Sequence, residues 1–266
     1  MPPHSCAADR WPPVRASRES HVPRYKLIIE YDGGGLAGWQ RQENGPSVQA
    51  ALEDAVFAYC GERAVVEGAG RTDAGVHASA QIGHVDLARG DPAQTVMKAI
   101  NHHLGKARIT VIAAEEAPDD FHARFSAEKR HYRYRILNRG ARPALDSGRV
   151  WHVVARLNAR AMHRAAQHLI GKHDFTTFRA AACQAPSPVK TLDVLSVARR
   201  GDEIIVRASA RSFLHNQVRA MVGSLRRVGE GKWPEDEIAA ALDARDRARC
   251  GPTAPACGLT LVGVDY

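Results

Sequence analysis

The feature that most constrains the fold is an order of predicted elements that occurs twice along the chain. In the first half, β-branched and aromatic runs predict strands, and apolar residues at helical spacing predict helices. The predicted elements are a strand at 25–31, a helix at 47–60, strands at 63–67 and 81–87, a helix at 91–104 and a strand at 108–115. This β-α-β-β-α-β order is typical of a ferredoxin-like domain.

The second half repeats this order with one added helix. Its predicted elements are a strand at 130–137, a helix at 158–169, strands at 189–198 and 203–210, helices at 215–231 and 235–243, and a strand at 258–266. Ser47, Asp91 and Asn158 can cap the helices that follow them. We therefore expect an α+β protein with two ferredoxin-like halves, whose mixed, mainly antiparallel sheets join around a central active-site cleft.

The chain is expected to divide into three segments. Residues 1–24 contain five prolines and little periodicity, which predicts a disordered N-terminal extension. The N-terminal half then spans 25–120 and the C-terminal half 121–266. We expect the boundary between the halves near 118–128.

The charge balance favours a polyanionic partner. The 266 residues carry a formal net charge of +8, within a composition that is otherwise ordinary for a globular protein. Basic residues interleave with aromatic ones between His122 and Arg142, and arginines gather again between Arg199 and Arg227. Because arginines grip phosphates and aromatic rings stack on bases, this pattern favours a nucleic acid over the plainer interpretation, a solvated strand face with core tyrosines.

Other features bear on the compartment. No apolar run approaches the roughly 18 residues that span a membrane, and the N-terminus lacks the apolar core of a secretory signal. The five cysteines are odd in number and lack CxxC spacing, which argues against a disulfide or zinc framework. We expect a cytoplasmic protein with reduced thiols.

A glycine-rich stretch, EGAGRTDAGVHA at 67–78, raises the question of chemistry. Between Gly68 and Ala78 its only carboxylate is Asp73. The glycine spacing fits neither a dinucleotide-binding fingerprint nor a P-loop. A tight turn, in which Asp73 bonds to nearby backbone N–H groups, is the plainest interpretation. A metal site with His77 and His84 would lack a third ligand at diagnostic spacing, so no metal is expected.

Catalysis by one carboxylate is the remaining interpretation. An aspartate is ionised at neutral pH and can attack without a partner base. Cleavage of a sugar linkage normally needs a second carboxyl as acid, whereas a uracil leaving group stabilises its own charge. A buried Asp73 would need a cation. Arg71 is near in sequence, and Arg219 lies beside the apolar stripe of its predicted helix, where it could pair with a carboxylate or extend to solvent.

Six stretches, in order along the chain, carry a resemblance to the tRNA pseudouridine synthase A family. They are EYDGGGLAGWQRQ (30–42), AGRTDAGVHA (69–78), DDFHARFSAEKRHYRYRI (119–136), DFTTFRA (174–180), FLHNQVRAMVGSL (213–225) and GLTLVGVDY (258–266). The resemblance implies two ferredoxin-like halves and five site residues. These are the catalytic Asp73, Tyr132 stacked on the target uracil, Arg219 paired with the aspartate, Leu259 lining the pocket, and Arg71 assisting extrusion of the base.

The resemblance also implies an activity. The family converts uridine to pseudouridine at positions 38, 39 and 40 of the tRNA anticodon stem-loop, as a homodimer without a cofactor. The target base must be flipped out of its stack. We expect Arg124, Arg130 and Arg133 to hold the RNA backbone. A base must remove the C5 proton, for which Tyr132 and Asp73 are both candidates.

Two alternatives remain at this point. A non-catalytic RNA-binding protein would explain the charge and the aromatics, but not the isolated Asp73. A hydrolase acting on small glycosides would need a second placed carboxylate, for which the sequence offers no good candidate.

Overall fold

The computed structural model describes residues 22–43 and 45–266. The predicted N-terminal extension therefore lies outside the described residues as far as residue 21. Within the described part, Arg24 already belongs to the first strand, one residue earlier than expected, and its guanidinium pairs with Asp86 at 2.7 Å.

The strands of the described part form one sheet with the order β4-β1-β3-β10-β5-β9-β8-β7, where β2 also pairs with β3 and β6 with β5. The sheet is mostly antiparallel. Their bounds are β1 Arg24–Tyr31, β2 Glu67–Gly68, β3 His77–Asp86, β4 Ile109–Ala117, β5 Lys129–Leu137, β6 Trp151–His152, β7 Gly171–Asp174, β8 Val189–Arg200, β9 Glu203–Ala210 and β10 Leu259–Asp265.

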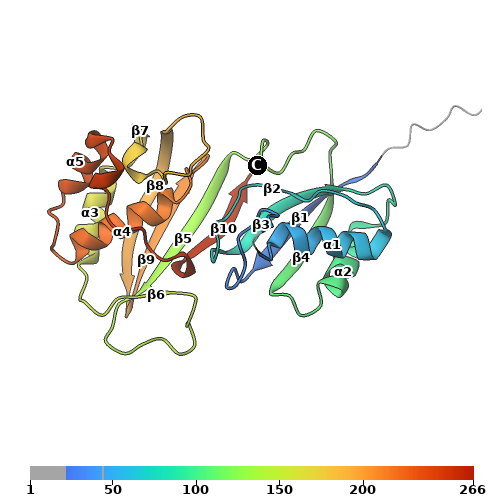
Figure 1. Ribbon diagram of the computed structural model, residues 1–266, viewed down its shortest axis with the longest axis horizontal. Coiled ribbons are helices and arrows are strands. Elements are labelled where there is room, and N and C mark those ends of the chain that lie inside the picture. Colours follow the sequence, from blue (N-terminus) through green and yellow to red (C-terminus); the bar gives the residue numbers. More distant parts are fainter. Residues whose placement is uncertain (1–21, 44) are drawn as a thin grey trace, which may run out of the picture.

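The helices form two groups beside this sheet. Figure 1 shows α1 and α2 beside β1 to β4, and α3, α4 and α5 beside β5 to β9. Their bounds are α1 Val48–Cys60, α2 Ala93–Leu104, α3 Ala159–Gln167, α4 Gln217–Gly229 and α5 Glu237–Ala244. Two predicted caps are confirmed: the Ser47 side chain accepts from Ala50 N, and Asn158 accepts from Arg160 N and Ala161 N. The cap predicted at Asp91 is wrong, because Pro92 stands at the N-cap of α2 and no side chain caps this helix.

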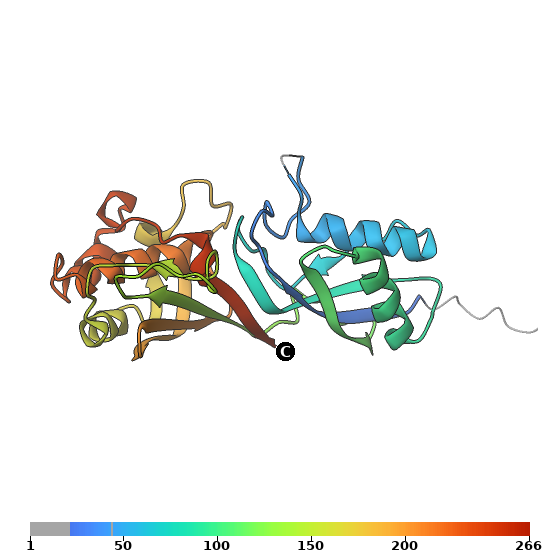
Figure 2. The same cartoon turned by 90° about the horizontal axis from the view of Figure 1, so that it is seen from below.

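The last strand joins the two groups of strands. β10 runs parallel to β3 through Thr260 opposite His77 and Leu261 opposite Ala78, and antiparallel to β5 along most of its length. Figure 2 shows the C-terminal end of β10 at the centre of the molecule, between the two groups. One continuous sheet therefore stands where two joined sheets were expected.

The predicted strand at 63–67 is wrong for most of its length. Only Glu67–Gly68 pairs, and it pairs with the C-terminal part of β3, opposite His84 and Gly83. β10 takes the other end of the same β3 edge, at His77 and Ala78. The chain between β2 and β3 therefore leaves the edge as a loop, and this loop contains Asp73.

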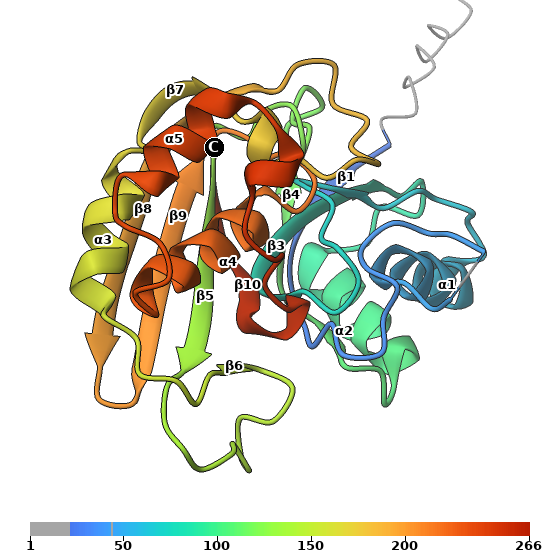
Figure 3. The same cartoon turned by 60° about the vertical axis from the view of Figure 1, so that its left-hand side comes forward.

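A row of paired side chains crosses the middle of the sheet. Residues that pair across neighbouring strands project their side chains to the same face of the sheet. The side chains of this row therefore lie on the face covered by helices, and they belong to the two hydrophobic core clusters or pack against them. Tyr132 packs against both clusters, which meet at this row. The row consists of Tyr31, Ala78, Leu261, Tyr132, Ala208 and Leu195. Helix α4 lies over the same region, in front of β9 and β5 in Figure 3.

None of the helices in the described residues is both long and apolar enough to cross a membrane.

Candidate active site

The loop that carries Asp73 is held against the segment after β1. Trp39 N donates to Thr72 O at 3.1 Å, and a Cβ on Gly38 would lie 2.5 Å from the same oxygen, so only glycine permits this approach. The Thr72 hydroxyl lies 2.8 Å from the buried Tyr31 hydroxyl. Gly75 adopts a φ of 77°, a conformation that glycine adopts readily. These contacts fix the backbone on both sides of Asp73.

The structure brings Arg219 of α4 to this carboxylate. Nη1 of Arg219 lies 3.2 Å from Oδ2 of Asp73, and the two side chains are only 18% and 22% exposed. The guanidinium has further acceptors, because Nε donates to Ala254 O at 2.8 Å and Nη1 to Asn216 Oδ1 at 2.7 Å. Of the two arginines considered from sequence, Arg219 is therefore the one that pairs with Asp73.

A histidine that the sequence reasoning missed faces the other carboxylate oxygen. His215 Nε2 lies 3.4 Å from Asp73 Oδ1, with 43% of the His215 side chain exposed. His215 lies before α4, and the left-handed backbone of Asn216 separates it from the helix. Its contact with Asp73 depends on how this segment packs against the Asp73 loop, for which the sequence gives no local signal.

Tyr132 lies on β5 beside this group. Its ring packs edge-to-face on Phe213, with centroids 5.3 Å apart and planes at 88°. Burial raises the pKa of Tyr132, and the nearby Tyr31 and Asp73 add to the effect. At neutral pH the side chain is therefore a neutral phenol. Leu259, at the start of β10, is 5% exposed and belongs to the core cluster against which Tyr132 packs.

Arg71 is exposed, and its guanidinium has no hydrogen-bond or ion-pair partner among the described residues. It therefore does not hold Asp73 in this structure. It lies two residues from Asp73, on the loop itself, and remains free to meet a ligand.

The expectation that Arg130 grips RNA is wrong. Arg130 is 9% exposed and donates to four backbone carbonyl groups, and burial lowers its pKa. Its acceptors are Ala69 O at 2.6 Å, Arg124 O at 2.7 Å, Arg211 O at 2.6 Å and Ala127 O at 3.0 Å. It is an internal brace that joins the Asp73 loop to two other segments.

The structure also gives no support to the predicted contact between Arg133 and the RNA backbone at this site. Arg133 follows Tyr132 on β5, so its side chain points to the opposite face of the sheet. It lies opposite Arg207 of β9 there. Arg124, the third expected contact, is exposed and lies over the Phe125 ring, 5.6 Å from its centroid.

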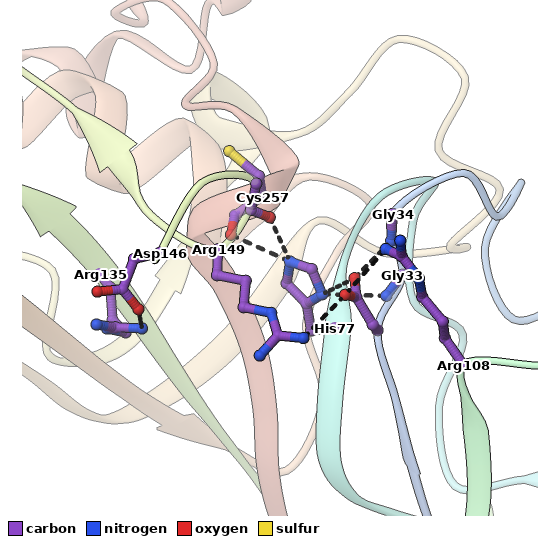
Figure 4. A network of polar contacts seen from close by, with 10 residues as sticks. Gly33, Gly34, His77, Arg108, Arg135, Asp146, Arg149 and Cys257 are labelled. Carbon is purple, nitrogen blue, oxygen red and sulfur yellow. Dashed lines mark hydrogen bonds and ion pairs between the residues drawn. The ribbon is translucent and has the colours of Figure 1, made fainter. Parts of the chain in front are cut away.

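A polar network anchors the far end of the loop (Figure 4). The Asp32 carboxylate accepts from Gly34 N at 3.0 Å, Arg149 Nη2 at 3.2 Å and Arg108 Nη1 at 3.3 Å. Burial opposes ionisation of Asp32, but these donors, with His77 nearby, outweigh it, and the pKa of Asp32 lies below its ordinary value.

His77 links this network to the segment that precedes β10. Its Nδ1 lies 3.0 Å from Gly33 N and 3.1 Å from Asp32 Oδ1, and its Nε2 faces Gly148 O at 3.1 Å and Cys257 O at 3.2 Å. Because His77 begins β3, four residues after Asp73, the network fixes where the loop re-enters the sheet.

Neither a metal site nor the cavity lined by Asn158, His163 and Arg199 coincides with this group. No cluster of three or more His, Cys, Asp or Glu residues in 22–43 and 45–266 could hold a metal ion. A cavity of about 1170 Å³ lies at the start of α3 and along β8, with Asn158, His163 and Arg199 in its lining, away from Asp73. The arrangement at Asp73 is suited to chemistry at a single carboxylate.

Comparisons with known proteins agree with this class of site. The family model described as tRNA pseudouridine synthase matches residues 27–126 and 165–266. Proteins named tRNA pseudouridine synthase A from Mesorhizobium japonicum and Rhodopseudomonas palustris are 61% and 63% identical over 92% of this chain and 100% of their own length. The protein of that name from Caulobacter vibrioides is 58% identical over 92% of this chain and 99% of its own. The chain belongs to the tRNA pseudouridine synthase family.

Proposed function

We propose that the protein converts uridine to pseudouridine at positions 38, 39 and 40 of the tRNA anticodon stem-loop, with Asp73 as the nucleophile. The observation that carries the proposal is the position of Asp73. Its carboxylate lies between Arg219 and His215 and is still 22% exposed, so a substrate can reach it. Membership of the family supplies the reaction, and this geometry supports Asp73 as the group that performs it.

Access to the uridine requires base flipping. A stacked uridine hides its C1′ atom, and extrusion costs a few kcal/mol. Stacking of the flipped base on the Tyr132 ring returns about 1–3 kcal/mol. Arg71, which is exposed and lies two residues from Asp73, is placed to enter the space that the base leaves. Leu259 closes the apolar side of the pocket beside Tyr132 and helps to exclude water.

The reaction is an isomerisation that consumes no other reactant. An Asp73 oxygen attacks C1′, the N1–C1′ bond breaks, and the uracil leaves with its electron pair. The uracil turns within the pocket and C5 bonds to C1′ while the ester to Asp73 breaks. The C5 proton is then lost and N1 gains one. Arg219 orients the carboxylate for the attack through the charge-assisted hydrogen bond from Nη1 to Oδ2 of Asp73.

Exposed arginines hold the RNA backbone, and the buried Arg130 fixes the main chain of the segments that carry them. Arg130 binds the carbonyl groups of Arg124 and Arg211, and that of Ala69, two residues before Arg71. The side chains of Arg71, Arg124 and Arg211 are all exposed. This grouping supports a phosphate-binding rim beside Asp73, and tRNA binding should weaken steeply with salt.

Two further proposals concern organisation. The strand order β4-β1-β3-β2 recurs as β10-β5-β9-β8, and the family model matches one segment in each half. Both observations support two ferredoxin-like halves, 25–120 and 121–266. We also infer a cytoplasmic homodimer that needs no cofactor, on the basis of the family resemblance.

Release of tritium from tRNA labelled at uracil C5 tests the function, with sequencing of the modified positions. The wild-type protein should release tritium, leave no free uracil and modify positions 38 to 40. Tight tRNA binding without release would favour a non-catalytic RNA-binding protein. Free uracil as product would favour a hydrolase.

A further inference from the structure

We infer that Asn216 is a positioning residue of the reaction, which aims the Arg219 guanidinium at Asp73. The expected effect on kcat rests on the proposed function, whereas the expected effect on the position of Arg219 does not. Three observations carry it: a rare backbone conformation, a helix cap that the side chain does not make, and the hydrogen bonds of Arg219.

The backbone of Asn216 is in the left-handed region, with φ 63° and ψ 3°. Only Asn216 and Arg245 among the described non-glycine residues have positive φ. Such conformations are sparsely populated and cluster at functional sites, and asparagine tolerates them better than most residues. The strained residue stands directly before α4, three positions from Arg219.

The side chain of Asn216 does not do what a helix N-cap normally does. Asparagine at this position usually has an extended backbone, and its side-chain oxygen accepts from an N–H of the first turn. Asn216 makes no such bond. The neighbouring Gln217 side chain bonds the segment before the helix, because its Oε1 accepts from Leu214 N at 2.8 Å. The amide of Asn216 is thereby available for another purpose.

The Asn216 side chain instead accepts a hydrogen bond from Arg219. Nη1 of Arg219 donates to Asn216 Oδ1 at 2.7 Å and lies 3.2 Å from Asp73 Oδ2. An arginine has donors only, so the amide atom facing it must be the oxygen. Nε donates to Ala254 O at 2.8 Å and fixes a second point of the planar group. Asn216 and Ala254 together set the guanidinium plane, and Nη1 then has one hydrogen left for Asp73.

The left-handed backbone makes this possible, since it places the Asn216 side chain beside Arg219 rather than over the first-turn N–H groups. A residue with an extended backbone would point its side chain to the cap. Loss of the amide leaves Arg219 oriented only by Ala254 O at Nε and by Asp73 itself, so that Nη1 can turn away from Asp73.

Asn216→Gly is the informative variant, because glycine keeps the positive φ and removes only the amide. We expect kcat to fall about tenfold, with KM for tRNA within about twofold, since a charge-assisted hydrogen bond that orients the site is lost. Asn216→Asp keeps an oxygen at the same place and should retain more activity than Asn216→Gly. Arg245→Gly is the matched control: it changes the other left-handed residue, and kcat should not change.

A double-mutant cycle separates positioning from a general structural effect. Because Asn216 acts through Arg219, Asn216→Gly should lower kcat no further in an Arg219→Ala background. A full tenfold loss in that background, or wild-type kcat for Asn216→Gly, would overturn the inference.

A crystal structure of Asn216→Gly tests the same point without activity. The Nη1–Oδ2 separation should lengthen beyond hydrogen-bond range, and an unchanged 3.2 Å contact would contradict the inference. If the wild-type protein forms no pseudouridine, the proposed function fails, and this structural measurement still decides the role of Asn216.

Discussion

Asp73 and Arg219 are 146 positions apart in the chain, yet Arg219 Nη1 lies 3.2 Å from Asp73 Oδ2. The contact joins the loop between β2 and β3 to helix α4, which lies beside β5 to β9. It exists because β10 pairs with both β3 and β5 and so brings the two groups of strands into one sheet. The site therefore depends on how the two groups of strands meet.

Arg219→Ala should reduce catalysis far more than tRNA affinity. The guanidinium is mostly buried and contacts the carboxylate rather than the rim, so its loss disturbs the reacting group. We expect kcat to fall roughly 100- to 1000-fold, with the Kd for tRNA within about threefold. Arg227→Ala, further along the same helix, is the control for lost positive charge. An Arg219 effect confined to Kd would identify a phosphate contact instead.

His215→Ala should have a much smaller effect. The ring is 43% exposed and its nitrogen lies 3.4 Å from Asp73 Oδ1, so the interaction resembles a surface ion pair. Such pairs contribute about 0–1 kcal/mol, which corresponds to a loss in kcat of no more than about fivefold. Steady-state kinetics beside Arg219→Ala will rank the two partners. A larger loss than that of Arg219→Ala would reverse their assigned roles.

Arg130→Ala should destabilise the fold. It removes a buried cation and leaves four backbone carbonyl groups without their donor, for which we expect a loss of roughly 3 kcal/mol in the free energy of unfolding. Urea denaturation measures this loss. Arg124→Ala, at an exposed neighbour, should stay within about 0.5 kcal/mol of wild type. Equal stability of the two variants would show that Arg130 is not a brace.

Cys183 should be the most readily alkylated of the four described cysteines. Burial opposes its ionisation, but the backbone N–H groups of Ala185 and His215 and the Arg179 guanidinium outweigh it, so the pKa of the thiol is lowered. Burial raises the pKa of Cys250 and of Cys257. As pH rises, iodoacetamide should label Cys183 first, with an inflection below the ordinary value of about 8.5. Mass spectrometry would contradict this if Cys250 reacts first.

Local signals in the sequence were enough to predict most elements. Ser47 and Asn158 precede apolar residues at helical spacing, and both side chains make the predicted caps. These features depend on residues a few positions apart. The lone Asp73 between glycines was also visible, since its setting is a local pattern.

Long-range pairing explains what the sequence did not reveal. The strand predicted at 63–67 has suitable residues, but most of it does not pair, and β10 takes the other end of the same β3 edge. Arg130 lies in a stretch where basic and aromatic residues interleave, which favours an RNA contact. Only the four backbone carbonyl groups around its guanidinium show that this side chain is internal. The role of His215 depends likewise on where α4 packs against the Asp73 loop.

The most direct test of the central claim is single-turnover tritium release from C5-labelled tRNA by Asp73→Asn, with tRNA binding measured in parallel. Asparagine keeps the shape of the side chain and removes the nucleophilic charge. We predict that release falls by at least about 10,000-fold while the Kd for tRNA stays within about threefold. Near wild-type release by Asp73→Asn would contradict the account.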